Sequence, residues 1–195
     1  KIPTFVLGVG LGGLIILNLL EKTELPIEGI LLFSPMLELK RDYKGRKNKL
    51  ISNVGKISKD TRFKVGITPQ DLTRNDEIIE ETANDGLMLK KVTYSWYNLI
   101  NEKMKETMDH IRDIKPISAL IMYGTNDKIL ETQSINEMKD KLKSKGMYFK
   151  VWDGLYHEIH NEPERDLVMR YVLSFLNNSV NTMGFIVNEE EIEDI

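Results

Sequence analysis

The chain has 195 residues, of which 41% are hydrophobic, so it is long enough to bury a core and most simply forms one domain. Its formal net charge of −3 at pH 7 gives no basic field for a nucleic-acid backbone, which argues against nucleic acid as a partner. The absence of cysteine excludes disulfides and thiolate metal sites, and it fits a reducing, cytoplasmic location.

Residues 1–36 have the pattern of a strand, a helix and a second strand. The β-rich apolar run 3–8 predicts a strand, residues 14–22 are apolar all round like a helix packed on a sheet, and residues 27–35 predict a second strand. This order predicts a βαβ unit with parallel strands. The first apolar run is Gly-rich and too short for a membrane span.

Charged and apolar residues alternate at helical spacing between residues 37 and 115, which predicts a mainly helical insertion. A cluster of basic residues near its start is interpreted as a solvated face, with anionic lipid as the alternative partner. The cluster consists of Lys40, Arg41, Lys44, Arg46, Lys47 and Lys49. Aromatic and methionine side chains farther along are interpreted as core, with the lining of an acyl channel as the alternative. These are Tyr94, Trp96, Tyr97, Met104 and Met108.

The α/β pattern returns in residues 116–178. The predicted elements are a buried strand at 117–124, an amphipathic helix at 131–146 closed by Gly146, a strand at 147–154, and a helix at 162–178 that opens on Pro163. The last segment, residues 179–195, is acidic and is expected to be frayed.

The turn after the first predicted strand fits two motifs. Gly8, Gly10 and Gly13 match the G-x-G-x-x-G of a dinucleotide-binding turn, whereas Gly8, Gly10 and Gly12 match a G-x-S-x-G nucleophile elbow with glycine in place of serine. A dinucleotide turn also needs an acidic side chain at the end of the second strand, and the nearest acids lie before that strand and well beyond it. The elbow is therefore favoured, and no cofactor is expected.

The elbow has two companions in the order that α/β-hydrolases use, which is nucleophile, acid, histidine. Asp127 follows the predicted strand 117–124, and His157 follows the strand 147–154, 157 − 127 = 30 residues later.

The segments PTFVLGVGLGG, GILLFSP, YGTNDKI and GLYHEIHNEPE, in this order, resemble the monoacylglycerol lipase and lysophospholipase branch of the α/β-hydrolase fold. The resemblance covers the chain up to about Asn178. It implies a mostly parallel sheet flanked by helices, with the hydrolase core at 1–36 and 116–178, a helical lid at 37–115 and a tail at 179–195. It also implies hydrolysis of carboxylic esters, with a lipid or another small ester as substrate and without metal or cofactor.

Carried over to this chain, the resemblance gives Asp127 the place of the triad acid, His157 that of the general base and Gly10 that of the nucleophilic serine. The Leu11 amide takes the place of one oxyanion-hole donor. Because glycine has no hydroxyl, we expect the protein to be inactive or impaired as an ester hydrolase. If hydrolysis persists, His157 would act as a base toward water. The alternatives are a non-catalytic lipid- or partner-binding protein and, more remotely, a NAD-binding domain.

Two hydroxyls and one pair of histidines are candidates for a substitute nucleophile and for a metal site. Ser34 and Thr125 occupy positions that the resemblance marks as structural, so neither is expected to replace the nucleophile. His157 and His160 are three residues apart in a predicted loop, which does not fit the His-Glu-x-x-His spacing of a zinc helix.

The relatives implied by the resemblance carry further strands before the elbow, whereas nine residues precede Gly10 here. The sequence therefore predicts that N-terminal strands and one oxyanion-hole donor are missing, as in a shortened copy of the kind that viral genomes retain. The strand at 3–8 would then be an exposed apolar edge open to self-association. The lid is expected to allow peripheral contact with a membrane.

Overall fold

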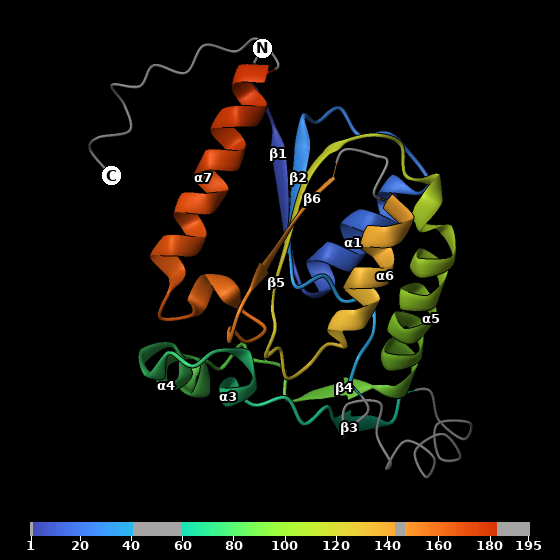
Figure 1. Cartoon of the computed structure of the whole chain (residues 1–195). Coiled ribbons are helices and arrows are strands. Elements are labelled where there is room, and N and C mark those ends of the chain that lie inside the picture. The colour runs from blue at the N-terminus through green and yellow to red at the C-terminus, as the bar shows by residue number, and fades with distance from the viewer. Residues whose placement is uncertain (1, 41–59, 143–146, 183–195) are drawn as a thin grey trace.

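The computed structural model describes residues 2–40, 60–142 and 147–182. Within them a parallel sheet lies between helices on both faces, and an insertion projects from one end (Figure 1). Most of the basic cluster, the predicted helix end at Gly146 and the acidic end of the tail lie outside the described residues. In the part that is described, none of the helices has the length and apolar character needed to cross a membrane.

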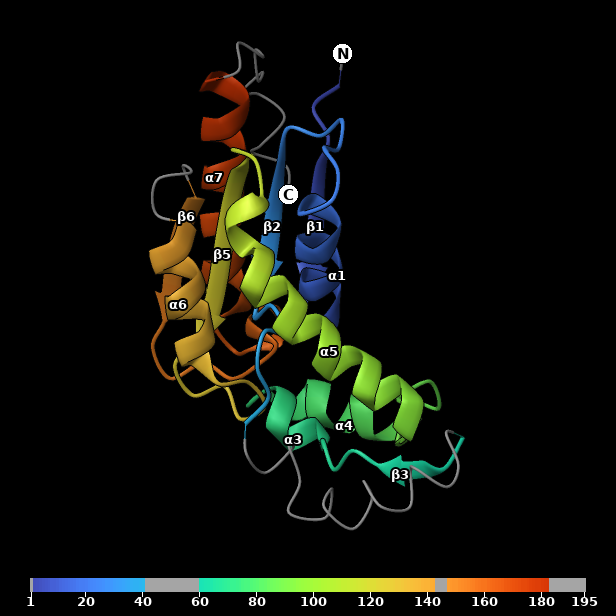
Figure 2. The same cartoon turned by 90° about the vertical axis from the view of Figure 1, so that its right-hand side faces the viewer.

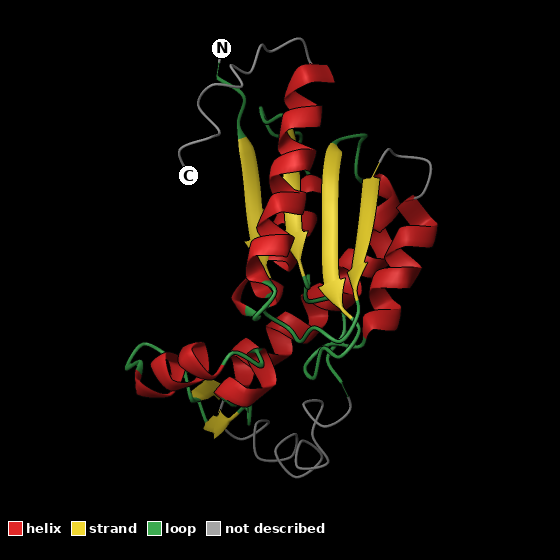
Figure 3. Ribbon diagram, turned by 60° about the vertical axis from the view of Figure 1, so that its left-hand side comes forward, coloured by secondary structure: helices red, strands yellow, loops and turns green. Residues whose placement is uncertain are grey.

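The sheet consists of β1 (Phe5–Val9), β2 (Gly29–Phe33), β5 (Ser118–Gly124) and β6 (Met147–Trp152). Its order is β1-β2-β5-β6 and every pairing is parallel, as the sequence predicted. Because β2 and β5 are neighbours, the whole insertion is one long crossover between adjacent strands. All four strands therefore end on the same side of the molecule (Figure 3).

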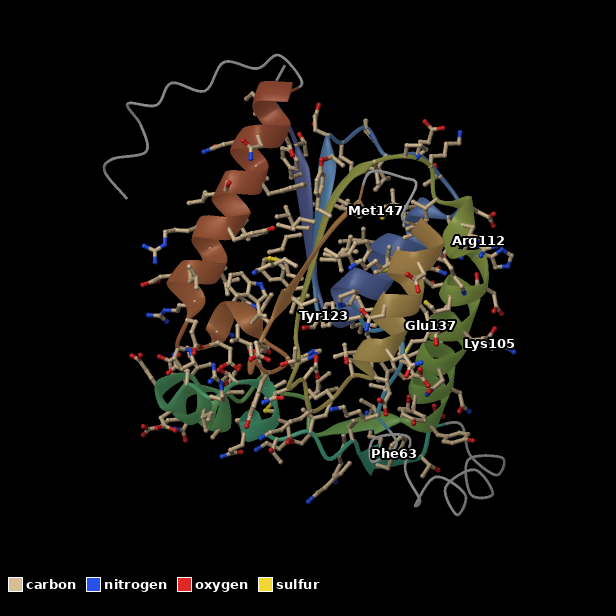
Figure 4. The ribbon with its side chains drawn as sticks, viewed as in Figure 1. Phe63, Lys105, Arg112, Tyr123, Glu137 and Met147 are labelled. Atoms are coloured by element: carbon tan, nitrogen blue, oxygen red, sulfur yellow. The ribbon has the colours of Figure 1, made fainter. Side chains whose placement is uncertain are left out.

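Helices α1 (Leu11–Leu20) and α6 (Thr132–Leu142) cover one face of the sheet, and α7 (Arg165–Thr182) covers the other (Figure 1). Figure 4 labels Tyr123 on β5, whose hydroxyl donates a hydrogen bond of 2.7 Å to Asn136 on α6. Helix α7 continues beyond its predicted end at residue 178, because no proline or glycine stands there to stop it.

Alternate residues of the strands fill two cores, one on each face. Ile30, Leu32 and Ile121 pack with the buried side of α1, whereas Leu31, Phe33 and Met122 pack with α7. This alternation explains why the strands read as continuous apolar runs, since both faces are buried.

Three of the four glycines in the turn are required by close packing or by backbone geometry. A Cβ on Gly8 would lie 2.6 Å from the Ile16 side chain, one on Gly13 would lie 2.9 Å from Pro35, and Gly10 has a positive φ of 51°. A Cβ on Gly12 would meet nothing within 4 Å. Gly12 therefore matches the elbow motif without being required by close packing.

The insertion lies beyond the carboxyl ends of the strands, and α5 reaches from it back to the sheet (Figure 2). Its elements are β3 (Arg62–Lys64), α3 (Pro69–Leu72), α4 (Asp76–Asn84), β4 (Lys91–Thr93) and α5 (Tyr94–His110). The prediction of a mainly helical insertion missed the β3–β4 antiparallel pair. Three-residue strands are too short to display an alternating pattern.

Some of the aromatic and methionine side chains of the insertion lie in the hydrophobic core. Tyr97 and Met104 are buried in a cluster that includes Leu14 of α1. The ring of Phe63, labelled in Figure 4, packs edge-on against Tyr97 at 5.4 Å between centroids. Trp96, by contrast, is 39% exposed.

Strand β1 is an edge strand of the sheet formed by the described residues, and Leu7 at its centre is 53% exposed. An apolar edge was predicted from the sequence. The absence of further N-terminal strands stays a prediction.

Candidate active site

The three residues singled out from the sequence come together where the strands end. Gly10 follows β1, Asp127 lies three residues beyond β5, and His157 lies in the loop after β6. In open α/β sheets this edge is where ligands bind. Residues that follow three separate strands thus form one small site at the carboxyl edge of the sheet.

Asp127 and His157 form a buried hydrogen-bonded pair. Asp127 Oδ2 lies 2.8 Å from His157 Nδ1, and the two side chains are 0% and 8% exposed. The other oxygen of Asp127 accepts the amides of Ile129 at 2.8 Å and Leu130 at 2.9 Å. Asp127 is therefore both a turn-capping residue and the partner of the imidazole, and the remaining nitrogen of His157, Nε2, is turned toward Gly10.

Gly10 occupies a backbone conformation that side chains rarely adopt, with φ 51° and ψ −112°. Its N–H donates to Phe33 at 2.9 Å, and its carbonyl accepts the Met36 amide at 2.9 Å. A Cβ built on Gly10 would lie 3.1 Å from His157 Nε2. A hydroxyl on that Cβ would therefore be within hydrogen-bonding reach of the imidazole.

Leu11 is the first residue of α1, which begins directly after Gly10. The first amides of a helix have no intrahelical acceptor, and the helix dipole adds partial positive charge there. The first turn of α1 holds no acidic residue to offset this field. The Leu11 amide thus lies where negative charge next to position 10 would be stabilised.

The two other hydroxyls near the site make structural contacts. Ser34 is fully buried, has a positive φ of 43°, and donates a hydrogen bond of 2.7 Å to the carbonyl oxygen of His157. Thr125 contacts Asp153 at 3.1 Å and accepts the Gly154 amide at 2.8 Å. Ser34 holds the backbone of the histidine loop, and Thr125 fastens the turn after β6.

His160 lies on the 3-10 turn Ile159–Asn161, with its ring 5.7 Å from that of Phe33. Burial lowers the pKa of His160, since the charged imidazolium loses hydration, and a smaller lowering comes from His157. The nearby Glu158 opposes this lowering. Burial therefore favours the neutral form of His160 beside the site.

Several contacts that hold the site were not predicted from the sequence. The Lys40 ammonium donates to the carbonyl of Asp127, and that of Lys128 lies 4.0 Å from the centre of the Tyr156 ring. Arg74 of the insertion pairs with Glu162 beyond the histidine. No spacing in a single sequence signals these contacts, because each one joins segments that only the fold brings together.

Known proteins are similar to this chain in sequence and in fold. Phospholipase YtpA of Bacillus subtilis (strain 168) is 28% identical over 180 residues, which cover 92% of this chain and 70% of that protein. The structure is similar to that of a monoacylglycerol lipase from Paleococcus ferrophilus, with a TM-score of 0.80, 23% identity, and coverage of 91% of this chain and 69% of that one. It is also similar to a soluble variant of monoglyceride lipase from Saccharomyces cerevisiae, with a TM-score of 0.76, 19% identity, and coverage of 91% and 62%.

The parallel sheet, the glycine elbow and these neighbours define the α/β-hydrolase fold. Residues 1–164 match the family described as "Serine aminopeptidase, S33". The chain belongs to this family of α/β-hydrolases, and the resemblance to monoacylglycerol lipases inferred from its sequence is confirmed.

Proposed function

We propose that this protein is an α/β-hydrolase of the monoacylglycerol lipase and lysophospholipase type that binds a lipid ester and has lost covalent acyl transfer. The observation that carries the proposal is the 3.1 Å between a Cβ at position 10 and His157 Nε2, which supports Gly10 as the position that a nucleophilic serine would occupy. The buried Asp127–His157 pair and the similarity to a bacterial phospholipase support the ester chemistry.

In this proposal Asp127, His157 and the Leu11 amide catalyse the hydrolysis that remains without a serine. Asp127 holds the imidazole with its proton on Nδ1, which leaves Nε2 free to accept a proton. His157 then acts as general base toward a water molecule beside the ester carbonyl. The Leu11 amide stabilises the oxyanion that forms. When the oxyanion collapses and the ester C–O bond breaks, the proton on Nε2 passes to the leaving alcohol.

Without the nucleophile we expect residual hydrolysis to be very slow. Loss of the serine in a well-studied protease lowers kcat by roughly 10⁶-fold, and the remaining catalysis comes from binding and the oxyanion hole. A deficit of at least this size is expected here, because glycine at position 10 supplies no attacking oxygen.

The test is an assay of the unaltered protein with a monoacylglycerol, measuring binding by calorimetry and fatty-acid release by chromatography. We expect saturable binding with release only slightly above the uncatalysed rate, and loss of that remainder in His157→Ala. Rapid release that His157→Ala abolishes would show that the protein is an active hydrolase without its serine. No binding of any acylglycerol or lysophospholipid would exclude the lipid-ester site.

We also propose that the insertion makes peripheral contact with lipid. Leu87 and Leu89, in the loop between α4 and β4, are 87% and 78% exposed, and Lys90 and Lys91 follow them. Exposed leucines next to lysines can enter the headgroup region of a bilayer while the ammonium groups stay in water.

Replacing both leucines, as Leu87→Ser with Leu89→Ser, is expected to lower the fraction bound to phosphatidylcholine vesicles in cosedimentation by about tenfold, because both apolar side chains are lost. Leu99→Ser, which changes an exposed leucine on α5, serves as the matched control. Equal binding by the double variant and the control would exclude this loop as the contact.

A further inference from the structure

The insertion is fastened to the loop that carries His157. Thr73, between α3 and α4, donates its hydroxyl proton to the Asn161 carbonyl at 2.9 Å. The Leu72 carbonyl accepts the Glu158 amide at 2.8 Å. Arg74 Nε lies 2.7 Å from Glu162 Oε2, and the Arg74 amide lies 3.3 Å from Glu162 Oε1. Three consecutive residues of the insertion thus bind the histidine loop.

These contacts surround His157 itself. The amide before it, that of Tyr156, donates to Glu162 Oε1 at 3.0 Å. The amide after it, that of Glu158, donates to the Leu72 carbonyl. The carbonyl of His157 accepts a hydrogen bond from the Ser34 hydroxyl. The backbone on both sides of the imidazole is therefore fixed, and two of these three hydrogen bonds depend on Glu162 or on the insertion.

Glu162 is the central member of this set. Its side chain is 0% exposed, so its charge needs a partner, and Arg74 provides one while remaining 34% exposed. Burial acts to lower the pKa of the Arg74 guanidinium, but hydrogen bonds to Glu164 and Glu162 raise it above its usual value. Arg74 also lies over the Tyr156 ring, at 6.0 Å from its centre.

We propose that Arg74 and Glu162 are positioning residues that hold the His157 imidazole against Asp127 and toward position 10, and that they couple the insertion to the orientation of this histidine. The inference deepens the proposed function, since it concerns the base of the same site. The coupling limits how the insertion can move as a lid. Either residues 72–74 stay in place while the rest of the insertion moves, or the histidine loop moves together with residues 72–74.

The test observes the imidazole directly and needs no turnover, so it stands apart from the assay of ester hydrolysis. The chain has three histidines, which makes long-range ¹H–¹⁵N spectra of the labelled protein readily assignable. In the unaltered protein we expect neutral His157 as a single tautomer with its proton on Nδ1. In Arg74→Ala we expect a mixture of tautomers and exchange of the Glu158 amide at least about tenfold faster, because the loop opens locally.

Three variants separate positioning from general destabilisation. Arg74→Lys keeps the charge partner of Glu162 and is expected to restore most of the single tautomer. Thr73→Val removes the hydrogen bond to the Asn161 carbonyl and the one from the Asn75 amide, but it leaves Arg74 paired with Glu162. It therefore tests the proposal even if Arg74→Ala fails to fold. Lys103→Ala breaks an ion pair on α5 and is the matched control.

We expect the tautomer mixture of His157 and the exchange rate of the Glu158 amide to change most in Arg74→Ala, less in Thr73→Val and least in Lys103→Ala. The spectrum of the exposed His110 is expected to stay unchanged in every variant. The proposal is overturned if the folded Arg74→Ala and Thr73→Val proteins keep the unaltered tautomer and amide exchange rate. It is equally overturned if Lys103→Ala changes the tautomer of His157 as much as Arg74→Ala and Thr73→Val do.

Discussion

Gly10→Ser is expected to yield an esterase that a fluorophosphonate probe labels at position 10, with hydrolysis of a short-chain ester raised by three orders of magnitude or more. The physical reason, under the proposed function, is that a Cβ at position 10 would lie 3.1 Å from His157 Nε2. The turn at Gly10, the buried acid and the imidazole are in place, whereas glycine lacks the attacking oxygen. The expected gain is a large part of the roughly 10⁶-fold that a serine protease loses with its serine.

The gain should carry a cost in stability. At φ 51° a side chain is strained by about 1–3 kcal/mol, and the new Cβ, 3.1 Å from His157 Nε2, requires the ring to shift by a few tenths of an ångström. We therefore expect Gly10→Ser to unfold at lower denaturant concentration than the unaltered protein. This pairing of higher activity with lower stability is typical of strained nucleophile turns.

Two controls separate the hydroxyl from the strain. Gly10→Ala adds the same Cβ and should lose the same stability without gaining labelling or hydrolysis. Gly10→Ser combined with His157→Ala should lose most of the gain, because the hydroxyl then has no base. Labelling of Gly10→Ser that survives His157→Ala in full would mean that the pair does not activate position 10.

Much of the core was predictable because its signals are local. The strands around Leu31 and Leu120 are apolar on both faces, and the glycines punctuate the turn, so the βαβ unit and the later α/β pattern could be read from the chain. The order of Gly10, Asp127 and His157 predicted which strand ends meet. The sheet, once formed, brings these three residues together without further information.

The supports of the site could not be read in the same way. Arg74 and Glu162 are 88 positions apart in the sequence. Ser34 and His157, whose carbonyl it hydrogen-bonds, are 123 positions apart. Their pairing depends on how the insertion returns to the sheet, and no periodicity encodes that path. The positive φ of Ser34 was equally hidden, since serine gives no signal for a left-handed backbone.

Gly124→Ala is expected to cost about 3 kcal/mol or more of the free energy of unfolding, and to displace the histidine loop in whatever fraction stays folded. A Cβ on Gly124 would lie 2.1 Å from the Leu155 carbonyl oxygen and 2.7 Å from that of Tyr156. These atoms belong to backbone, which cannot rotate away as a side chain would, so the cost lies at the upper end of that for overpacking. Urea unfolding followed by fluorescence measures it.

The matched control is Gly12→Ala, which makes the same chemical change in the first turn of α1. Its Cβ would meet nothing within 4 Å, and alanine favours a helix over glycine by about 1 kcal/mol, so we expect a neutral or stabilised protein. Because Leu155 and Tyr156 directly precede His157, Gly124→Ala should also reduce the activity gained by Gly10→Ser, whereas Gly12→Ala should leave His157 in place. Equal stability of the two alanine variants would mean that β5 and the histidine loop do not pack as closely as this structure has them.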